Sequence, residues 1–459
     1  MSYPILLLLS GALAVLPSAP RPADGVDDLE FEELVAAVAA RALEDDVVSG
    51  LSIAVAVGPE LLVSEGWGYA DANRGQPAGA ASRYRAGAVT PQLVAAALVR
   101  LAQGGALDLD DPVHEHLGGL PYGELEGGPI TLRHLLTHTS GIPDCGALVE
   151  SMEQRGAEPS GEALLAAIGA LTLEFDAGDC FAYSASNDFL LGLVLEAVTE
   201  LEVAEHLRQA VFEPLELEDT LYCYESAPLR ERAAAVREVA GELVEDDSGF
   251  QPFRADALCS SAPDLVRWLR ALVQEDWAGE EGRAVLFGEA RLADGSPTSY
   301  GCGFGLTPLE DYEGVSFGGG SGGSRVHVAY YPAPDLTIAV LASGEDAPVA
   351  RLERRIAREF FELPLPGIQD LPLTPERRAR YGGDYYVGCS RYQIAERGER
   401  LHLLPPEGDG HVLLYQGRDV FLAEDDPETR LTFELGERGP ARSFLLEEQG
   451  AQTVARRMD

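Results

Sequence analysis

A serine within a run of glycines is one residue whose setting suggests chemistry. The segment 319–323, Gly-Gly-Ser-Gly-Gly, matches the pattern G-x-S-x-G, in which a sharp turn between a strand and a helix exposes a nucleophilic serine, here Ser321. The residues that follow alternate as Val326, Val328 and Tyr330, which predicts a strand where the motif requires a helix. We therefore interpret this match as a coincidence of the glycine run.

Histidines and cysteines offer other possible chemistry. His134 and His138 are four residues apart, a spacing that can hold a metal on one helix face, but no third ligand pattern accompanies them. We interpret this pair as structural, together with His114 and His116, and expect no metal and no cofactor. The six cysteines, which contain no C-x-x-C pair, are Cys145, Cys180, Cys223, Cys259, Cys302 and Cys389. Disulfides and buried free thiols remain equal alternatives for them.

The sequence contains no lysine, and every basic residue is arginine. An arginine side chain does not lose its proton in a protein. No arginine of this sequence can therefore replace a lysine that acts as a general base.

The elements that would position such residues follow from hydrophobic periodicity. Helices are predicted over 27–46, 93–101, 132–138, 161–171, 187–199, 262–274 and 351–361. Strands are predicted over 51–57, 61–67, 325–331 and 336–342. A proline-rich linker over 363–375 separates this part from the tail, residues 376–459. In the tail, short strands at 385–394, 401–404, 412–415, 420–422, 431–435, 443–446 and 453–457 predict a small barrel or sandwich.

A long segment in the middle of the chain carries a family resemblance. Residues 130–144, Ile-Thr-Leu-Arg-His-Leu-Leu-Thr-His-Thr-Ser-Gly-Ile-Pro-Asp, closely resemble a stretch of the serine β-lactamase, DD-peptidase and esterase-like family. Segments 105–113, 181–192, 212–220 and 261–265 also resemble that family, in the same order. The resemblance implies an α/β (α+β) fold over 27–362, in which an antiparallel sheet flanked by helices joins a helical subdomain. The tail is similar to a β domain that some members append.

In this family acyl transfer uses a serine nucleophile, a lysine base one helical turn later, a tyrosine and an oxyanion hole. In the matching segment 84–91, Ala88 occupies the serine position and Pro91 the lysine position. Alanine has no nucleophilic atom and proline has no basic side chain, whereas a proline is tolerated in a helix's first turn. In a well-studied triad enzyme, loss of the nucleophile alone lowers turnover roughly 10⁶-fold.

The other two family motifs are altered as well. Tyr183 is retained, but Ala185 replaces the usual amide, and Gly319 occupies the position of the usual lysine or histidine. Ser184 and Ser186 flank Tyr183, with His138 as the nearest candidate for a histidine base. The predicted vestigial pocket consists of Ala88, Pro91, Tyr183, Ala185, Gly319, Gly320 and Ser321.

Three functions follow as hypotheses. The first is a non-catalytic binding protein whose cleft takes a small peptide-like or acyl ligand. The second is an active serine hydrolase with a relocated nucleophile. The third is a structural protein that binds a partner through its C-terminal domain.

Charge and the N-terminus limit the setting. With 76 acidic and 34 basic residues the formal charge is −42, so nucleic acid and membrane surfaces are poor partners. Residues 1–23 contain an apolar run too short for a confident membrane span, and we predict a signal peptide. The expected location is periplasmic or extracellular.

Overall fold

The computed structural model describes most of the chain. The described residues are 28–44, 48–71, 75–120, 122, 127–154, 160–222, 236–239, 242–245, 258–274, 277–321, 323–387, 389–405, 410–436, 439–448 and 451–457. The predicted signal peptide and Cys223 lie outside these ranges. None of the helices in these ranges has the length and apolar character that a membrane crossing requires.

Strands from both ends of the first 360 residues build a central antiparallel sheet. Within the described ranges its order is β3-β2-β1-β12-β11-β10-β9. The strands are β1 (Gly50–Val57), β2 (Glu60–Asp71), β3 (Gln76–Pro77), β9 (Gly305–Leu306), β10 (Val315–Ser321), β11 (Ser324–Tyr331) and β12 (Leu336–Ser343). The nearly continuous apolar runs of β1 and β12 are typical of strands buried on both faces. These two strands pair in the middle of the sheet, with Val55 opposite Ile338.

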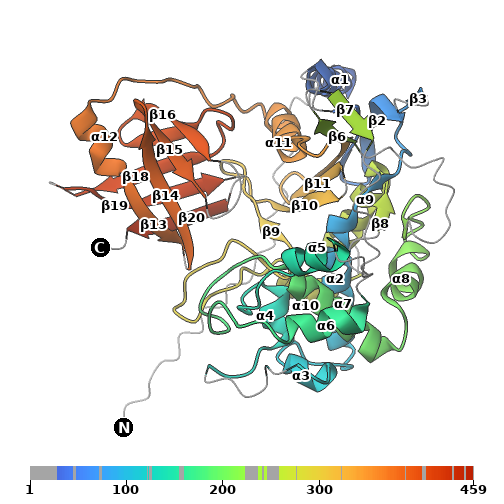
Figure 1. Cartoon of the computed structure of the whole chain (residues 1–459). Helices are drawn as coiled ribbons and strands as arrows, with labels where there is room; N and C mark the ends of the chain where they lie inside the picture. The colour runs from blue at the N-terminus through green and yellow to red at the C-terminus, as the bar shows by residue number, and fades with distance from the viewer. Residues whose placement is uncertain are drawn as a thin grey trace, which may run out of the picture.

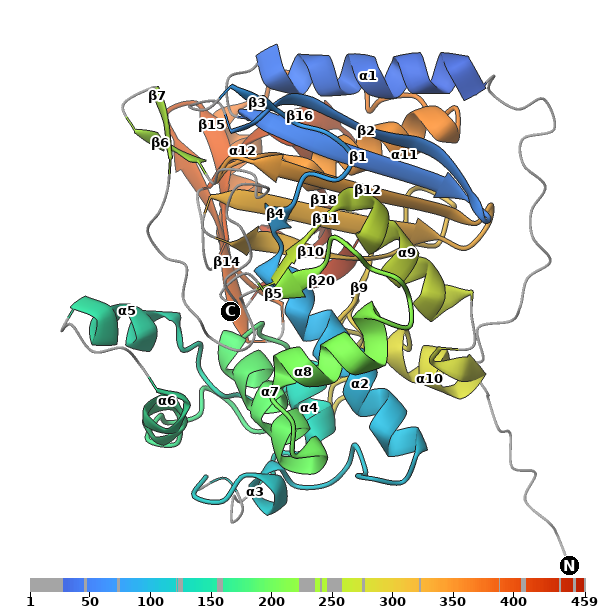
Figure 2. The same ribbon diagram turned by 90° about the vertical axis from the view of Figure 1, so that its right-hand side faces the viewer.

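Helices cover both faces of this sheet (Figure 2). On one face, α1 (Asp28–Glu44) and α11 (Val349–Phe360) pack together, and the rings of Phe31 and Phe360 meet edge to face. On the other face, α9 (Ala262–Val273) and α2 (Thr90–Gln103) share a large apolar core with the strands. The sheet therefore lies between two layers, and the second layer continues into the helical part of the molecule.

The helical part comes from the middle of the chain. Its other helices are α3 (Val113–His116), α4 (Leu132–Leu136), α5 (Gly146–Gln154), α6 (Gly161–Ile168), α7 (Ala185–Thr199), α8 (Val203–Leu207), the π-helical turn η2 (Arg208–Phe212) and α10 (Gly279–Leu286). Among the shorter strands, β4 (Tyr84–Arg85), β8 (Leu258–Ser260) and β5 (Leu221–Tyr222) form a three-stranded sheet, and β6 (Val236–Val239) pairs with β7 (Glu242–Glu245). The prediction of an antiparallel sheet flanked by helices, with a helical subdomain, is confirmed.

The tail forms a closed barrel beside the sheet (Figure 1). Its strands are β13 (Gly383–Val387), β14 (Ser390–Arg397), β15 (Arg400–Leu404), β16 (His411–Gly417), β17 (Val420–Ala423), β18 (Arg430–Leu435), β19 (Ala441–Glu448) and β20 (Ala451–Arg457). Because β13 pairs with both β14 and β20, the ladder closes, and the alternative of a sandwich is wrong. Aromatic rings such as Phe421 and Phe444 fill the interior.

One predicted strand of the tail is also wrong. Residues 385–394 form parts of two strands, because the chain reverses between Val387 and Ser390, which face each other in the hairpin. Aromatic and apolar residues lie on both sides of the turn, at Tyr385, Tyr386, Val387, Tyr392 and Ile394, so the pattern alone did not reveal the reversal. Between α11 and α12 (Pro375–Tyr381), residues 363–374 contain no helix or strand.

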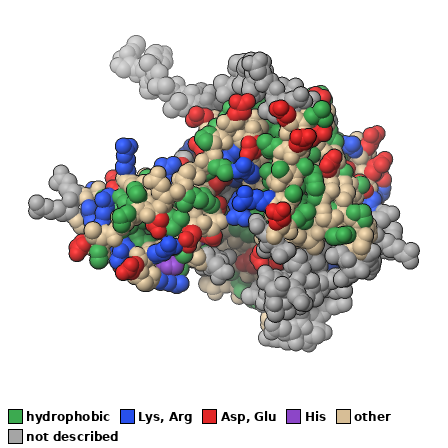
Figure 3. All heavy atoms as spheres, turned by 90° about the horizontal axis from the view of Figure 1, so that it is seen from above, with side chains coloured by type: hydrophobic (Ala, Val, Ile, Leu, Met, Phe, Trp, Pro, Cys, Tyr) green, Lys and Arg blue, Asp and Glu red, His purple; other side chains and the backbone are tan. Residues whose placement is uncertain are grey.

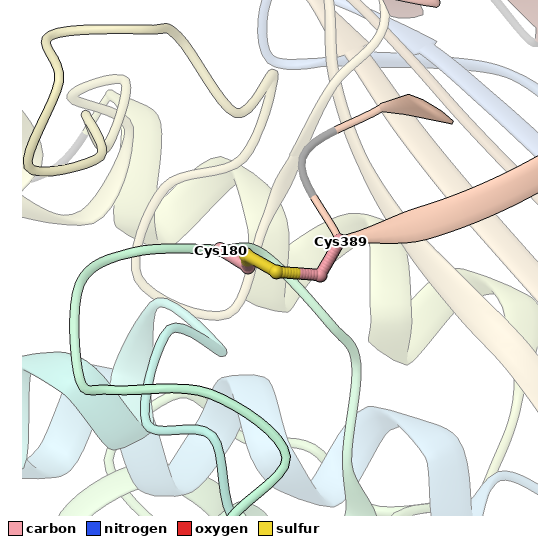
Figure 4. The surroundings of a disulfide bond; sticks show 2 residues. All are labelled: Cys180 and Cys389. Carbon is pink, nitrogen blue, oxygen red and sulfur yellow. A yellow bond between two sulfur atoms is a disulfide. The ribbon is translucent and has the colours of Figure 1, made fainter. Parts of the chain in front are cut away.

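Several contacts between described residues attach the barrel to the rest of the molecule. A disulfide joins Cys180, in the helical part, to Cys389 in the first barrel hairpin (Figure 4). In addition, the Glu428 carboxylate accepts hydrogen bonds from Arg354 and Arg358 of α11. Cys259 is also disulfide-bonded, whereas Cys145 and Cys302 are buried free thiols. Both alternatives for the cysteines thus hold in part.

Candidate active-site cleft

A cavity of about 750 Å³ lies at the open edge of the sheet, beside the barrel. Its walls come from five places: the start of α2, the turn before α7, strand β10 with its neighbours, the start of α11, and a barrel turn. Among the lining residues are Gln92, Tyr183, Tyr300, Ser316, Gly318, Gly319, Arg325, His327, Asp425 and Asp426. Segments far apart in the sequence therefore meet in one cleft.

The first wall is the N-terminus of α2. Ala88 lies in the 3-10 turn η1 (Gly87–Val89), and Pro91 lies in the first turn of the helix. The first-turn N–H groups have no partner within a helix, so this proline removes no helical hydrogen bond. The side chain of Ala88 is not among those that the structure describes. Gln92, the residue after Pro91, lines the cavity although its side chain was not predicted to take part.

Gln92 leaves this wall with an unsatisfied polar atom. The residue is 6% exposed, and its Oε1 accepts no hydrogen bond from any residue that the structure describes. The Thr90 hydroxyl, two residues earlier in α2, is likewise buried without a described partner. A buried carbonyl without a donor is destabilising, so Gln92 lowers the stability of this wall.

The second wall is strand β10, which carries the glycine run. Gly318 lies opposite His327 in the neighbouring strand, and a Cβ atom at Gly318 would lie 2.3 Å from the Val326 carbonyl oxygen. Only glycine permits this approach. Ser321, whose side chain lies outside the described ones, ends β10 and is followed by strand β11. The helix that a nucleophile elbow requires is therefore not the next element after Ser321.

Gly319 and Gly320 have different surroundings in this strand. Gly319 lines the cavity. A Cβ atom at Gly320 would collide with the guanidinium group of Arg325, which itself lines the cavity. Backbone and one arginine thus form this wall.

The third wall holds Tyr183, which is 57% exposed. Its hydroxyl donates a hydrogen bond of 2.8 Å to Oδ2 of Asp188, a carboxylate that is 6% exposed. The imidazole of His138 lies against the tyrosine ring, with centroids 4.4 Å apart, and its Nε2 is 3.7 Å from Asp188 Oδ1. This network orients the tyrosine toward the cleft.

His138 is held as a neutral hydrogen-bond acceptor. Its Nδ1 is 3.3 Å from the Ser184 N–H and 3.1 Å from Nδ2 of Asn187, so this nitrogen accepts and Nε2 carries the proton. Complete burial lowers the pKa of His138 to about 3. A buried histidine whose Nδ1 already accepts hydrogen bonds and whose pKa is so low is a poor general base, and its role here is structural.

The residues around Tyr183 are fixed by similar contacts. Ala185 is the first residue of α7, and its N–H donates to Oδ2 of Asp144 at 2.7 Å. Ser184 and Ser186 are 2% and 0% exposed, so neither hydroxyl is accessible. His134 accepts a hydrogen bond from the Thr131 N–H, which forms part of a capping box at the start of α4.

Two other cavity residues were missed by the sequence reasoning. Ser316 Oγ accepts a hydrogen bond from Thr307, and His327 Nε2 lies 3.6 Å from the Glu353 carboxylate on α11. Ser316 is two residues from Gly318, whose partner is His327, so both side chains project from the same sheet face. Only the register between β10 and β11 reveals this proximity. Among the described residues, no group of three possible ligands is arranged to hold a metal ion.

Comparisons with known proteins agree with this architecture. The sequence model of the beta-lactamase family matches residues 35–360. A penicillin-binding protein of Bacillus subtilis (strain 168) is 24% identical over 432 residues, covering 88% of this chain and 94% of that protein. A D-aminopeptidase of Gluconobacter oxydans (strain 621H) is 27% identical, covering 78% of this chain and 68% of that protein.

Solved structures resemble the fold. An octameric penicillin-binding protein homologue from Pyrococcus abyssi gives a TM-score of 0.64 at 21% identity, over 94% of this chain and 100% of that one. A D-amino acid amidase from Ochrobactrum anthropi SV3 gives a TM-score of 0.62 at 20% identity, over 72% of this chain and 99% of that one. At these identities the likeness concerns the fold alone.

Proposed function

Because this chain belongs to the beta-lactamase family, we propose that it is a catalytically degenerate member whose cleft binds a ligand without acylation. The ligand in this proposal is a small peptide-like or acyl molecule. We infer the fold and the cleft from the family relationship. We infer binding without catalysis from the residues at the cleft.

The observation that carries the proposal is the pair Ala88 and Pro91 at the start of α2. By the resemblance of segment 84–91 to the family, these positions belong to the nucleophile and its base, and neither residue can attack a carbonyl or accept a proton. The sequence offers no lysine from elsewhere, and the neutral, buried His138 is a poor substitute. The two groups that start acyl transfer therefore have no evident replacement on this wall.

Binding remains chemically reasonable in the same cleft. Tyr183 offers an exposed ring, and Arg325 offers a cation. The ring complements an apolar part of a peptide-like ligand, and the cation complements its negative end. We also propose export, which the leader favours and the Cys180–Cys389 disulfide supports, because disulfides persist in oxidising compartments.

Hydrolysis assays test the proposal. Purified protein is expected to leave nitrocefin and p-nitrophenyl esters intact at the rate of buffer alone. Hydrolysis that disappears in Tyr183→Phe would contradict the proposal, because it would assign catalysis to this cleft. A Tyr69→Phe variant is a matched control, since Tyr69 is 51% exposed and does not line the cavity.

One observation favours a second candidate, an active hydrolase with a relocated nucleophile. Ser316, His327 and Glu353 have the side chains of a nucleophile, a base and an orienting carboxylate. The first two line the cavity, and the third lies beside the histidine. Their weakness is that the Ser316 hydroxyl contacts Thr307 instead of the histidine. Labelling by a fluorophosphonate that is lost in Ser316→Ala would favour this candidate over the binding protein.

A further inference from the structure

A second hollow, of about 590 Å³, lies under the segment that connects α11 to the barrel. Helices α1 and α11 form its floor, and residues 365–368 and the barrel turn 426–428 form its sides. Its apolar lining consists of Leu34, Ala37, Val38, Ala42, Pro348, Leu352, Leu365, Pro366, Ile368 and Pro427. We name this hollow the α1–α11 groove. It is large enough to hold a small molecule.

The connecting segment exposes large apolar side chains at the groove. Leu365 is 55% exposed and Ile368 is 52% exposed, in a stretch without helix or strand. Leu371, a little further along, is 40% exposed. Clusters of exposed apolar side chains are unusual in folded proteins and commonly mark a binding surface.

Arginines stand beside this apolar lining. Seen from above, basic side chains gather over α11, where the barrel adjoins the sheet part (Figure 3). Arg41 of α1 and Arg351 and Arg355 of α11 line the groove. In a chain of formal charge −42, such a local concentration of cations is an exception that needs a cause.

Carboxylates within the chain account for only part of this cationic charge. Arg355 pairs with Glu359, and Glu428 is shared by Arg354 and Arg358. Arg351 instead donates to the backbone carbonyl of Asp425, at 3.0 Å.

Two of the lining guanidinium groups therefore remain available to an anion. Among the described residues, neither Arg41 nor Arg351 has a carboxylate within ion-pair distance. Asp426, the remaining acidic group of the lining, is already an acceptor for the Thr429 hydroxyl and the Glu428 N–H.

We propose that the α1–α11 groove binds a monomeric anionic amphiphile, with a carboxylate at Arg41 and Arg351 and an alkyl tail against the apolar lining. Apolar walls bury the methylene groups, and the two guanidinium groups hold the head. A bilayer surface is a poorer occupant, because the groove is a hollow of limited size and the chain as a whole repels anionic lipid. The proposal does not depend on the function of the cleft, although Pro348, Arg351 and Asp426 line both.

Calorimetric titration of the full chain with dodecanoate, kept below its micellar concentration, tests the proposal. One site per chain is expected. Octanoate should bind at least about tenfold more weakly, since each methylene removed from a fully buried tail weakens binding by roughly fourfold and the groove is partly open. Dodecyltrimethylammonium, with the same tail and the opposite charge, should also bind at least about tenfold more weakly, although the net charge of the chain favours cations.

Variants separate this site from general adsorption. Leu365→Ser with Ile368→Ser should weaken dodecanoate binding by about tenfold, and Leu61→Ser, a similarly exposed leucine outside the groove, should not. Arg41→Gln with Arg351→Gln should weaken it by about two- to tenfold, and Arg41→Lys alone should retain most of it. Equal affinity in all variants, equal affinity for the cationic amphiphile, or binding only to phosphatidylcholine vesicles would overturn the proposal.

Discussion

The two walls that carry the family's catalytic residues differ in how they are held. On the Tyr183 wall, the tyrosine hydroxyl, Asp188 and His138 hold one another, and the disulfide at Cys180 adds a covalent tie three residues away. On the α2 wall, Ala88 and Pro91 bring no polar side chain, and Gln92 leaves a buried carbonyl without a described partner. We call the Tyr183 wall the braced wall and the α2 wall the bare wall.

This difference suggests why one part of the machinery would be kept and the other lost. His138 and Asp188 pack into the core of the helical part, so their removal would damage the fold. In our proposal, a serine and a lysine at the start of α2 would have contributed chemistry and little to packing, so the fold would tolerate alanine and proline in their place. Retention of Tyr183 is thus explained by structure and is not evidence of catalysis.

The largest expected effect on stability comes from removal of the disulfide that holds the braced wall. Cys180 and Cys389 close a loop of 209 residues, and its release should lower the free energy of unfolding by about 5 kcal/mol in the chain-entropy account. Urea unfolding of the double variant Cys180→Ser with Cys389→Ser, compared with the oxidised chain, measures this. A midpoint that does not move would mean that the disulfide does not brace this wall.

The second largest expected effect is a pH dependence of the free energy of unfolding that arises from His138. Its pKa in the folded protein is about 3, below the ordinary 6.5, so the unfolded chain binds the proton more readily. The free energy of unfolding should therefore fall as the pH drops from about 6.5 toward 3, by up to on the order of 4 kcal/mol from this group. His138→Gln should show a flatter dependence over that interval. Identical slopes for the two proteins would contradict the neutral, buried histidine.

Removal of one hydroxyl from the braced wall should have a smaller effect. Tyr183→Phe removes one hydrogen bond to the Asp188 carboxylate, and the expected loss of stability is about 1.5 kcal/mol. Tyr69→Phe, at similar exposure and with no described hydrogen bond from its hydroxyl, should change stability by less than about 0.5 kcal/mol. Thermal denaturation of both variants under the same conditions shows whether this hydrogen-bond network stabilises the fold.

The smallest effect is expected on the bare wall, and its sign is opposite. Gln92→Leu replaces a buried carbonyl without a described partner by an apolar group of similar size, so stability should rise by about 1 kcal/mol. Urea unfolding measures the gain. A loss of similar size would show that Gln92 already has a stabilising partner, and the contrast between the walls would disappear.

The sequence was informative where periodicity or a long motif governs the structure. The antiparallel sheet, its flanking helices and an all-β tail followed from residue spacing and from segment 130–144. The sequence could not pair Cys180 with Cys389, because the two lie 209 residues apart and only the folded chain brings them together. It also missed Gln92, Ser316 and His327, whose place in the cavity depends on a strand register and on a helix orientation.

The most direct test of the central idea is the intact mass of the wild-type chain after exposure to benzylpenicillin and, separately, to a fluorophosphonate. A cleft that binds without acylation predicts an unchanged mass with both reagents. A stable addition of one reagent mass, mapped by peptide sequencing to a serine that lines the cavity, would contradict the proposal. It would show that the cleft can be acylated.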